Sequence, residues 1–205
     1  MVSTVDSVPG RDAAAHLLNP SRLWTREEAL ARPSAVPATG GVYAWYFSDL
    51  PGVPTAGCVT ARGHTLLYVG ISPSRPPANG RPASRQTLRT RVRYHYRGNA
   101  YGSTLRLTLG ALLADQIGLT LRRVGSGTRL TFSDGEALLS DWMSSHARVC
   151  WIEDSAPWVL EHALIRDLVL PLNLDQNAHS PFRVELSTAR AVQRARAKEL
   201  PVVPR

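Results

Sequence analysis

The spacing of hydrophobic and polar residues changes several times along this chain. Each stretch of regular spacing predicts a strand or a helix. Aromatic and β-branched residues fill positions 41–47, between Gly40 and Pro51, and predict a strand. Residues 66–71 form a second stretch of the same kind. A segment rich in Pro and Gly, residues 48–65, separates the two, so we expect an antiparallel pair joined by an enlarged loop.

Residues 84–97 have the four-residue spacing of an amphipathic helix. The stripe expected to face the sheet consists of Leu88, Val92 and Tyr96. Four arginines repeat at the same spacing on one flank of this stripe: Arg85, Arg89, Arg93 and Arg97. Arg91 and His95 lie on the opposite flank, one helical turn apart. The helix therefore separates a row of cations suited to phosphates from a candidate reactive pair.

The rest of the chain contains further predicted elements. Thr25 and Glu28 have the spacing of a capping box and predict a short helix that ends at residue 31. Further helices are expected at 103–117, 134–146, 155–170 and 187–198, with a strand at 148–152 and a hairpin at 119–132. Residues 72–85, rich in Pro, Gly, Arg and Ser, are expected to form a loop.

Composition limits the classes of protein to which the chain can belong. Its 205 residues, of which 43% are hydrophobic, suffice for one well-packed core. Cys58 and Cys150 lack the spacing of a zinc site or of a disulfide framework. No run of about 18 or more apolar residues occurs, and residues 1–19 lack the pattern of a signal peptide. We therefore expect a soluble, cytoplasmic protein with no membrane partner.

Charge is distributed unevenly along the chain. The formal net charge is +8, and residues 50–114 contain nine Arg but no Asp or Glu. Such a segment favours a polyanion, because Arg side chains neutralise phosphates and release their counterions. A solvated basic face without a partner is the other explanation. The expected nucleic-acid contacts are Arg75, Arg85, Arg89, Arg93 and Arg97.

Hydrolysis of a phosphodiester needs a group that activates water, a cation that stabilises charge on the phosphate and, in many enzymes, a divalent metal held by a carboxylate. Tyr43 and Tyr68 lie on the two predicted strands and are expected to be neighbours. The following helix would bring Arg91 and His95 over the end of the sheet. Each of the four also has an ordinary explanation, as a strand aromatic, a helix histidine or a residue of the basic face.

Glu161 is the candidate carboxylate. It lies in the predicted helix 155–170, for which Ser155 is the expected N-cap and Pro157 falls in the first turn. Its neighbours are mostly apolar, and a carboxylate buried among them must be paired or bound to a metal. An exposed helix residue beside His162 is the alternative explanation.

Gly41-Val-Tyr43 followed by Tyr68-Val-Gly70 resembles the paired GIY and YIG tripeptides of the GIY-YIG nuclease superfamily. Later residues that match the family, in its order, are Leu88, Arg91, His95, Glu161 and Asn173. The histidine and the asparagine are similar to those of members that act as restriction endonucleases. The resemblance extends from residue 40 to about residue 173.

This resemblance implies an α/β fold with a small central antiparallel sheet of about three strands flanked by helices, here with an added hairpin and added helices. Residues 40–175 would form the nuclease domain, with an insertion at about 98–132. Residues 1–39 would be an N-terminal appendage, and residues 176–205 a basic C-terminal tail.

The resemblance also implies an activity. The chain would be a DNA endonuclease that binds Mg²⁺ or Mn²⁺ at Glu161 and leaves 5′-phosphate and 3′-hydroxyl ends. Tyr43 would position or deprotonate the attacking water with help from His95, and Arg91 would stabilise the transition state. The residues expected to orient water, phosphate and metal are Tyr68 and Asn173.

The chain departs from the family pattern at two places. The interval between Tyr43 and Tyr68 is longer than in compact members, which implies a loop insertion. Some members carry Lys just after the second tripeptide, where this chain has Ile71 and then Ser. Arg75 or Arg85 would have to replace that charge.

Two other functions are compatible with the sequence. One is a catalytically inactive nucleic-acid-binding module on the same fold. The other is a protein-interaction domain that uses Trp45, Trp151 or Trp158, positions that core packing also explains. DNA is the expected partner, and RNA is an alternative. To cut both strands of a duplex, an enzyme with one active site would need to form a homodimer or to bind the DNA twice. No zinc-finger or helix-turn-helix spacing indicates which bases are recognised.

Overall fold

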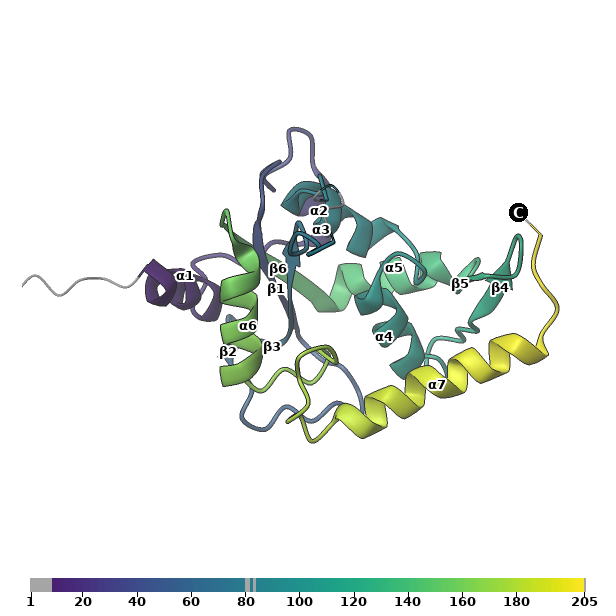
Figure 1. Cartoon of the computed structure of the whole chain (residues 1–205). Helices are drawn as coiled ribbons and strands as arrows, with labels where there is room; N and C mark the ends of the chain where they lie inside the picture. Colours follow the sequence, from purple (N-terminus) through teal and green to yellow (C-terminus); the bar gives the residue numbers. More distant parts are fainter. Residues whose placement is uncertain (1–8, 80–81, 83, 205) are drawn as a thin grey trace, which may run out of the picture.

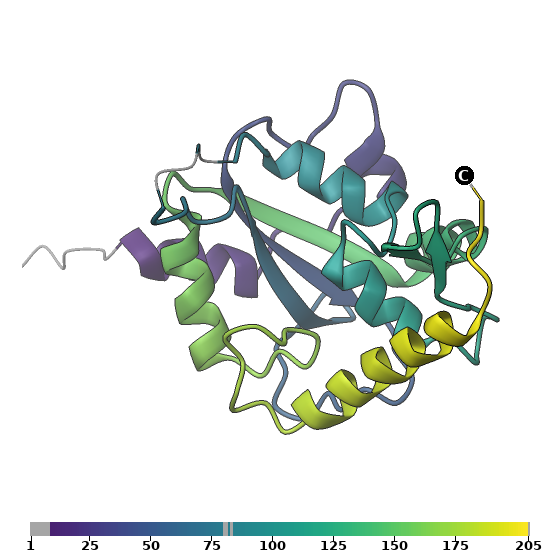
Figure 2. The same ribbon diagram turned by 45° about the vertical axis from the view of Figure 1, so that its right-hand side comes forward.

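The computed structural model describes residues 9–79, 82 and 84–204. A four-stranded antiparallel sheet in the order β2-β3-β1-β6 lies between helices that cover both of its faces (Figures 1 and 2). Its strands are β1 (Gly41–Phe47), β2 (Thr60–Ala61), β3 (His64–Ser72) and β6 (Ala147–Glu153). The predicted α/β class with a central antiparallel sheet is confirmed, but the sheet has four strands where about three were expected.

β1 is the central strand and is buried along its whole length, because β3 and β6 pair with its two sides and helices cover its faces. The register places Tyr43 opposite Gly70 and Trp45 opposite Tyr68. Residues that pair directly across an antiparallel ladder point to the same face of the sheet. The two tyrosines therefore lie on one face, as their positions on the predicted strands required.

Each face of the sheet packs on its own apolar core. One face is covered by α1 (Pro9–Leu18) and α6 (Pro157–Asp167). The other face is covered by α2 (Arg26–Leu30), α3 (Leu88–Arg97), α4 (Thr104–Leu112) and α5 (Gly135–His146). The expected inward stripe of α3 is confirmed, since its members are fully buried: Leu88, Val92 and Tyr96. Among the described helices, none has both the length and the apolar character needed to span a membrane.

Capping residues explain where several helices begin. The capping box of Thr25 and Glu28 is present at the start of α2, as predicted. α3 begins at Leu88, later than expected, because Thr87 caps it. The prediction of Ser155 as the N-cap of α6 is wrong, since α6 begins directly at the proline and Ala156 occupies the cap position without a side-chain hydrogen bond.

The C-terminal helix α7 (Arg183–Glu199) lies along α4, where both views of Figures 1 and 2 place it. The predicted hairpin consists of β4 (Arg122–Val124) and β5 (Arg129–Thr131). Arg123 donates hydrogen bonds to the carbonyls of Ala197, Lys198 and Leu200 at the C-terminal end of α7. The hairpin thus satisfies helix carbonyls that have no partner within the helix.

A buried ion pair joins α4 to α5. Arg106 is fully buried, and its guanidinium donates to the Glu136 carboxylate at 2.7 Å and 2.9 Å. It also donates to the carbonyls of His95 and Tyr96 and to the hydroxyl of Ser140. Because its charge is paired and its donors are used, the cost of burial is offset.

We expect Glu136→Ala to lower the free energy of unfolding by about 3–5 kcal/mol, because it leaves the buried Arg106 guanidinium without its counterion. Urea unfolding followed by circular dichroism measures this change. The matched control is Glu185→Ala, which removes an exposed carboxylate from α7 and should change stability by no more than about 0.5 kcal/mol. Equal losses in the two variants would contradict the assignment of a buried pair.

Candidate active site

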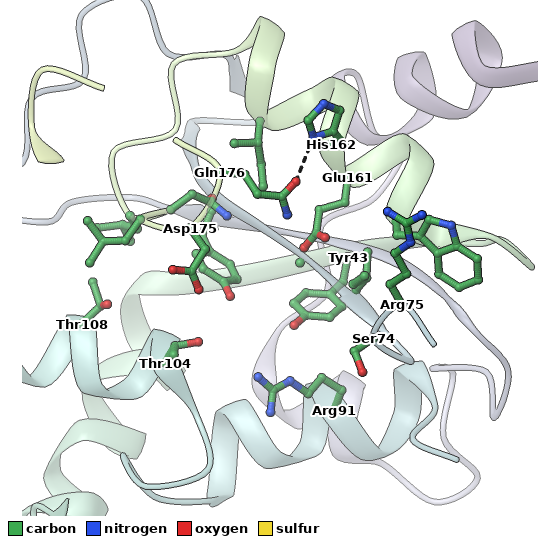
Figure 3. Close-up of a pocket in the computed structure, with 18 of the residues that line it drawn as sticks. Tyr43, Ser74, Arg75, Arg91, Thr104, Thr108, Glu161, His162, Asp175 and Gln176 are labelled. Atoms are coloured by element: carbon green, nitrogen blue, oxygen red, sulfur yellow. Dashed lines mark hydrogen bonds between the residues drawn. The ribbon is translucent and has the colours of Figure 1, made fainter. Parts of the chain in front are cut away.

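A pocket of about 590 Å³ lies where β1 and β3 meet α3, α4, α6 and α7. Of the six predicted catalytic residues, five line it: Tyr43, Tyr68, Arg91, Glu161 and Asn173. Figure 3 shows Arg91 and Glu161 approaching Tyr43 from opposite sides. His95 is the sixth, and it lies behind Tyr43 rather than in the pocket wall. The structure therefore brings together residues that are distant in the sequence.

The glycines of the two tripeptides allow close approaches that build this pocket. A Cβ atom on Gly70 would lie 2.6 Å from the Tyr43 hydroxyl and 2.8 Å from its ring, so the phenol occupies the space of the missing side chain. A Cβ atom on Gly41 would lie 2.1 Å from the carbonyl oxygen of Ile152 and 2.7 Å from Leu88. One glycine therefore makes room for Tyr43, and the other lets β6 and α3 close around the start of β1.

Tyr43 is 1% exposed, and its hydroxyl lies 2.9 Å from Nε2 of His95. The other ring nitrogen, Nδ1, lies 2.8 Å from Oγ of Ser103. Ser103 is the N-cap of α4, and its Oγ accepts the backbone N–H of Arg106 at 3.1 Å. A chain of hydrogen bonds thus runs from the pocket surface at Tyr43 to the start of α4.

Burial keeps this tyrosine and histidine pair neutral. It raises the pKa of Tyr43 well above its ordinary value, an effect that Tyr68 adds to and Arg91 opposes. Burial, with the positive charges of Arg91 and Arg106, lowers the pKa of His95 well below its ordinary value. Both shifts disfavour transfer of the phenol proton to the imidazole in the free protein, so the hydrogen bond joins two uncharged groups.

Arg91 faces the same phenols from α3. One of its Nη atoms donates to the carbonyl of Gly102 at 2.8 Å, which leaves further N–H donors on the guanidinium. Burial alone would lower its pKa, but Tyr43 and Tyr68 oppose this and the net shift is upward. Arg91 therefore stays charged beside Tyr43, as a group that stabilises a phosphate must.

Glu161 reaches the pocket from α6, which otherwise packs on the opposite face of the sheet. Burial raises its pKa to about 7, a hydrogen bond with Gln176 opposes the shift, and the carboxylate of Asp175 adds to it. Within the described ranges Glu161 forms no ion pair with a protein cation. A desolvated carboxylate without a counterion fits a metal ligand, because a bound cation would supply the missing charge.

The donor set around Glu161 is small. No group of three or more His, Cys, Asp or Glu side chains suited to a metal occurs in the described part of the chain. Mg²⁺ is commonly held by one or two carboxylates and keeps several waters. The pocket therefore fits a hydrated dication held by Glu161, with the carboxylate of Asp175 nearby as a second oxygen donor.

Asn173 shapes the edge of the pocket through the backbone of β3. Its side-chain amide accepts the N–H of Val69 at 3.0 Å and donates to the carbonyl of the same residue at 2.9 Å. The backbone N–H of Leu172 donates to Leu67 in a similar way. β2 pairs with only the first residues of β3, and the bonds from Leu172 and Asn173 supply partners further along the same edge. They also hold the loop that carries Asp175 and Gln176 against the site.

The five arginines predicted to contact nucleic acid occupy different surroundings. Only Arg75 lines the pocket. Arg89 is partly buried and donates from Nε to the carbonyl of Val36 at 2.8 Å. The remaining members of the set are exposed outside the pocket: Arg85, Arg93 and Arg97. Their contacts with nucleic acid stay predictions, and two other arginines, Arg91 and Arg190, line the pocket together with Arg75.

Several lining residues were not predicted as functional: Ser74, Thr104, Thr108, His162, Asp175, Gln176 and Arg190. Asp175 and Gln176 follow Asn173 in a polar turn. A loop has no regular spacing of hydrophobic residues, so the sequence does not indicate that these side chains face the pocket. His162 accompanies Glu161, and its Nδ1 lies 2.8 Å from Oε1 of Gln176. Sequence proximity to Asn173 and Glu161 was the available signal for these three.

A family model described as the GIY-YIG catalytic domain matches residues 41–192. The chain belongs to the GIY-YIG family. No curated protein and no solved structure gives a significant match. The matched segment begins at the first glycine of the Gly41-Val-Tyr43 tripeptide and includes every residue predicted for the site. The predicted superfamily is thereby confirmed, whereas the closer likeness to restriction-endonuclease members stays a prediction.

Membership of the GIY-YIG family has two consequences at a general level. GIY-YIG domains are nuclease domains, so a nucleic acid is the implied substrate and endonuclease activity is the family's activity. GIY-YIG nucleases generally depend on a divalent metal, which agrees with a buried Glu161 carboxylate that forms no ion pair among the described residues.

The raised pKa of Glu161 predicts how pH and Mn²⁺ act together on this GIY-YIG domain. The unfolded chain releases the proton near pH 4.5, whereas the folded protein holds it to about pH 7. Without metal, stability should therefore fall as pH rises through this window. Because Mn²⁺ needs the ionised carboxylate, it should raise Tm more at about pH 8 than at about pH 6. Thermal unfolding with Mn²⁺ and with EDTA measures both effects.

Glu161→Gln should remove the pH dependence of the Mn²⁺ effect, whereas Glu185→Gln, at an exposed position on α7, should leave it unchanged. A metal-induced shift in the Glu161→Gln variant that still grows with pH would assign the binding to another group.

Proposed function

We propose that this protein is a metal-dependent DNA endonuclease that hydrolyses phosphodiester bonds to 5′-phosphate and 3′-hydroxyl ends. The observation that carries the proposal is the single pocket that Tyr43, Tyr68, Arg91 and Glu161 share. Such a pocket combines a group that can orient water, a cation for the phosphate and an unpaired carboxylate for a metal, which are the parts that phosphodiester hydrolysis needs.

Tyr43 is the group that orients the attacking water. When Nδ1–H of His95 donates to Ser103, Nε2 accepts the Tyr43 O–H, and the lone pairs of the phenol oxygen face the pocket. These lone pairs accept a hydrogen bond from water. As the water oxygen bonds to phosphorus, its proton passes to the Tyr43 oxygen and the phenol proton passes to His95. The bond from phosphorus to the 3′ oxygen breaks, and the leaving oxygen takes a proton from solvent water to give the 3′-hydroxyl end.

Arg91 binds the phosphate in the same step. Its free N–H donors face the pocket beside Tyr43, where negative charge grows on the non-bridging oxygens. Tyr68, whose pKa burial raises, stays protonated and donates a hydrogen bond to an oxygen of the same group. Asn173 acts indirectly, because its amide holds the edge of β3 on which Tyr68 lies.

Glu161 is the residue that would hold Mg²⁺ or Mn²⁺, with Asp175 close enough to contribute through water. A bound dication supplies Lewis acidity, which neutralises charge on the phosphate and on the leaving 3′ oxygen. The protein contributes a desolvated carboxylate and a pocket of fixed shape, because Gln176 and His162 brace the carboxylate from the loop and from α6.

Cleavage of plasmid and of branched DNA in Mg²⁺ or Mn²⁺ tests the proposed activity. Arg91→Ala and Glu161→Ala should each lower kcat by a factor of about a hundred or more, because each removes stabilisation of transition-state charge. Arg166→Ala, which removes an exposed arginine that pairs with Asp167 outside the pocket, is the matched control and should retain kcat. Cutting that survives both active-site substitutions would reject the proposal. DNA binding without any cutting by the wild type would instead favour an inactive binding module.

Ser103 provides a second test, aimed at the orientation of His95. Ser103→Ala should lower kcat by roughly tenfold, equivalent to about 1.4 kcal/mol, with little change in KM, because the imidazole loses the partner that fixes its tautomer. Ser103→Thr keeps the hydroxyl and should restore most of the rate. Thr25→Ala removes a comparable N-cap from α2, away from the pocket, and should leave kcat unchanged. A rate loss in Thr25→Ala equal to that of Ser103→Ala would reduce the role of Ser103 to stability.

A further inference from the structure

The C-terminal helix α7 presents an arginine on its inward face. The buried residues of the helix are Leu186, Gln193 and Ala197, which define the stripe that packs on the rest of the protein. Arg190 lies four residues after Leu186 and three before Gln193, so it shares this stripe and points inward. Most other basic residues of α7 are exposed, which is the usual position for a charged side chain on such a helix.

Arg190 lines the pocket that contains Tyr68 and Glu161. Its Nε is buried and has no hydrogen-bond partner in the described part of the chain. Arg190 also forms no ion pair there, although the carboxylate of Asp175 lies near enough to influence it. Burial and the charge of Arg194 lower its pKa. Burying a guanidinium without a counterion costs free energy, and a bound anion would offset this cost.

Two contacts fix Arg190 in the pocket. α7 packs along α4, whose Thr104 and Thr108 line the same pocket. At its far end, α7 is held by Arg123 of the hairpin, which donates to the carbonyls of Ala197 and Lys198 in the last turn and of the C-cap residue Leu200. Figure 2 shows α7 and α4 lying side by side. The guanidinium is therefore presented by packed helices, which lowers the entropy lost on binding a ligand.

We propose that Arg190 is a second phosphate-binding cation, which holds a phosphate of the substrate strand next to the one bound by Arg91. The strand would then lie in the pocket that Arg190 lines, beside the hydroxyls of Thr104 and Thr108. This inference rests on the proposed nuclease function for the identity of the ligand. A phosphodiester fits the observed groups, because a guanidinium with free N–H donors binds phosphate oxygens in a bidentate manner.

Binding of a fluorescein-labelled DNA duplex of mixed sequence, measured by anisotropy in EDTA over a range of KCl concentrations, tests the inference. Arg190→Ala should weaken binding by about tenfold. It should also reduce the slope of log K against log [KCl] by about 0.9, the value expected for one lost phosphate contact on duplex DNA. Arg190→Lys keeps the charge and should recover the slope.

Arg196→Ala is the matched control. It removes one arginine from the same helix, but Arg196 is exposed and pairs with Asp115 at 3.8 Å outside the pocket. This variant should keep the affinity and the slope of the wild type. Unchanged binding in Arg190→Ala, or equal losses in the Arg190 and Arg196 variants, would overturn the inference.

The two proposals can fail separately. Binding in EDTA does not require catalysis, so a wild type that binds DNA through Arg190 but cuts nothing would reject the nuclease function and leave the phosphate site intact. Cutting that is lost in Glu161→Ala but unchanged in kcat and KM by Arg190→Ala would support the nuclease function and reject Arg190 as a phosphate contact.

Discussion

The burial of the Tyr43 hydroxyl is the constraint on which the site depends. A phenol at the interface of sheet and helix must have a hydrogen-bond partner, and His95 supplies it at 2.9 Å. That contact requires the observed register, in which Gly70 stands opposite Tyr43 and leaves room for the ring. It also requires Ser103 to be the N-cap of α4, because the second imidazole nitrogen needs a partner of its own. Register, glycine and helix start are therefore parts of one arrangement.

The pocket contains carboxylates and guanidinium groups that do not form ion pairs with one another in the described part of the chain. Glu161 and Asp175 lie in it without ion pairs to a protein cation in the described ranges, and so do Arg91 and Arg190. Glu161, Arg91 and Arg190 are partly buried, so their charges are less well solvated than in water, and leaving them unpaired costs stability. A dication at the carboxylates and phosphates at the arginines would relieve both sets at once. This arrangement agrees with the proposed pairing of a bound metal with a phosphate.

Much of the fold and most of the site were predictable from local patterns. The strands that carry the two tyrosines, the helix that carries Arg91 and the terminal helix were all expected, because their periods extend over enough residues. β2 was missed because a two-residue pairing inside a Pro- and Gly-rich loop has no period. Convergence of distant residues came from the family resemblance rather than from periodicity. The sequence did not predict that His95 lies behind Tyr43, outside the pocket wall. Helical spacing indicates which face of the helix a residue occupies, but not its distance from the pocket.

The segments outside the tripeptide strands help to form the walls of the pocket. The expected insertion at about 98–132 contributes Ser103 beneath His95 and the hairpin that holds the end of α7. The expected tail then places Arg190 in the same pocket as Glu161. The sequence predicted a basic helix at 187–198 but not which of its faces packs inward, so only the structure places Arg190 on the stripe of Leu186, Gln193 and Ala197. The total charge of α7 is therefore less informative than the placement of Arg190, which lines the pocket while Arg194, Arg196 and Lys198 are exposed.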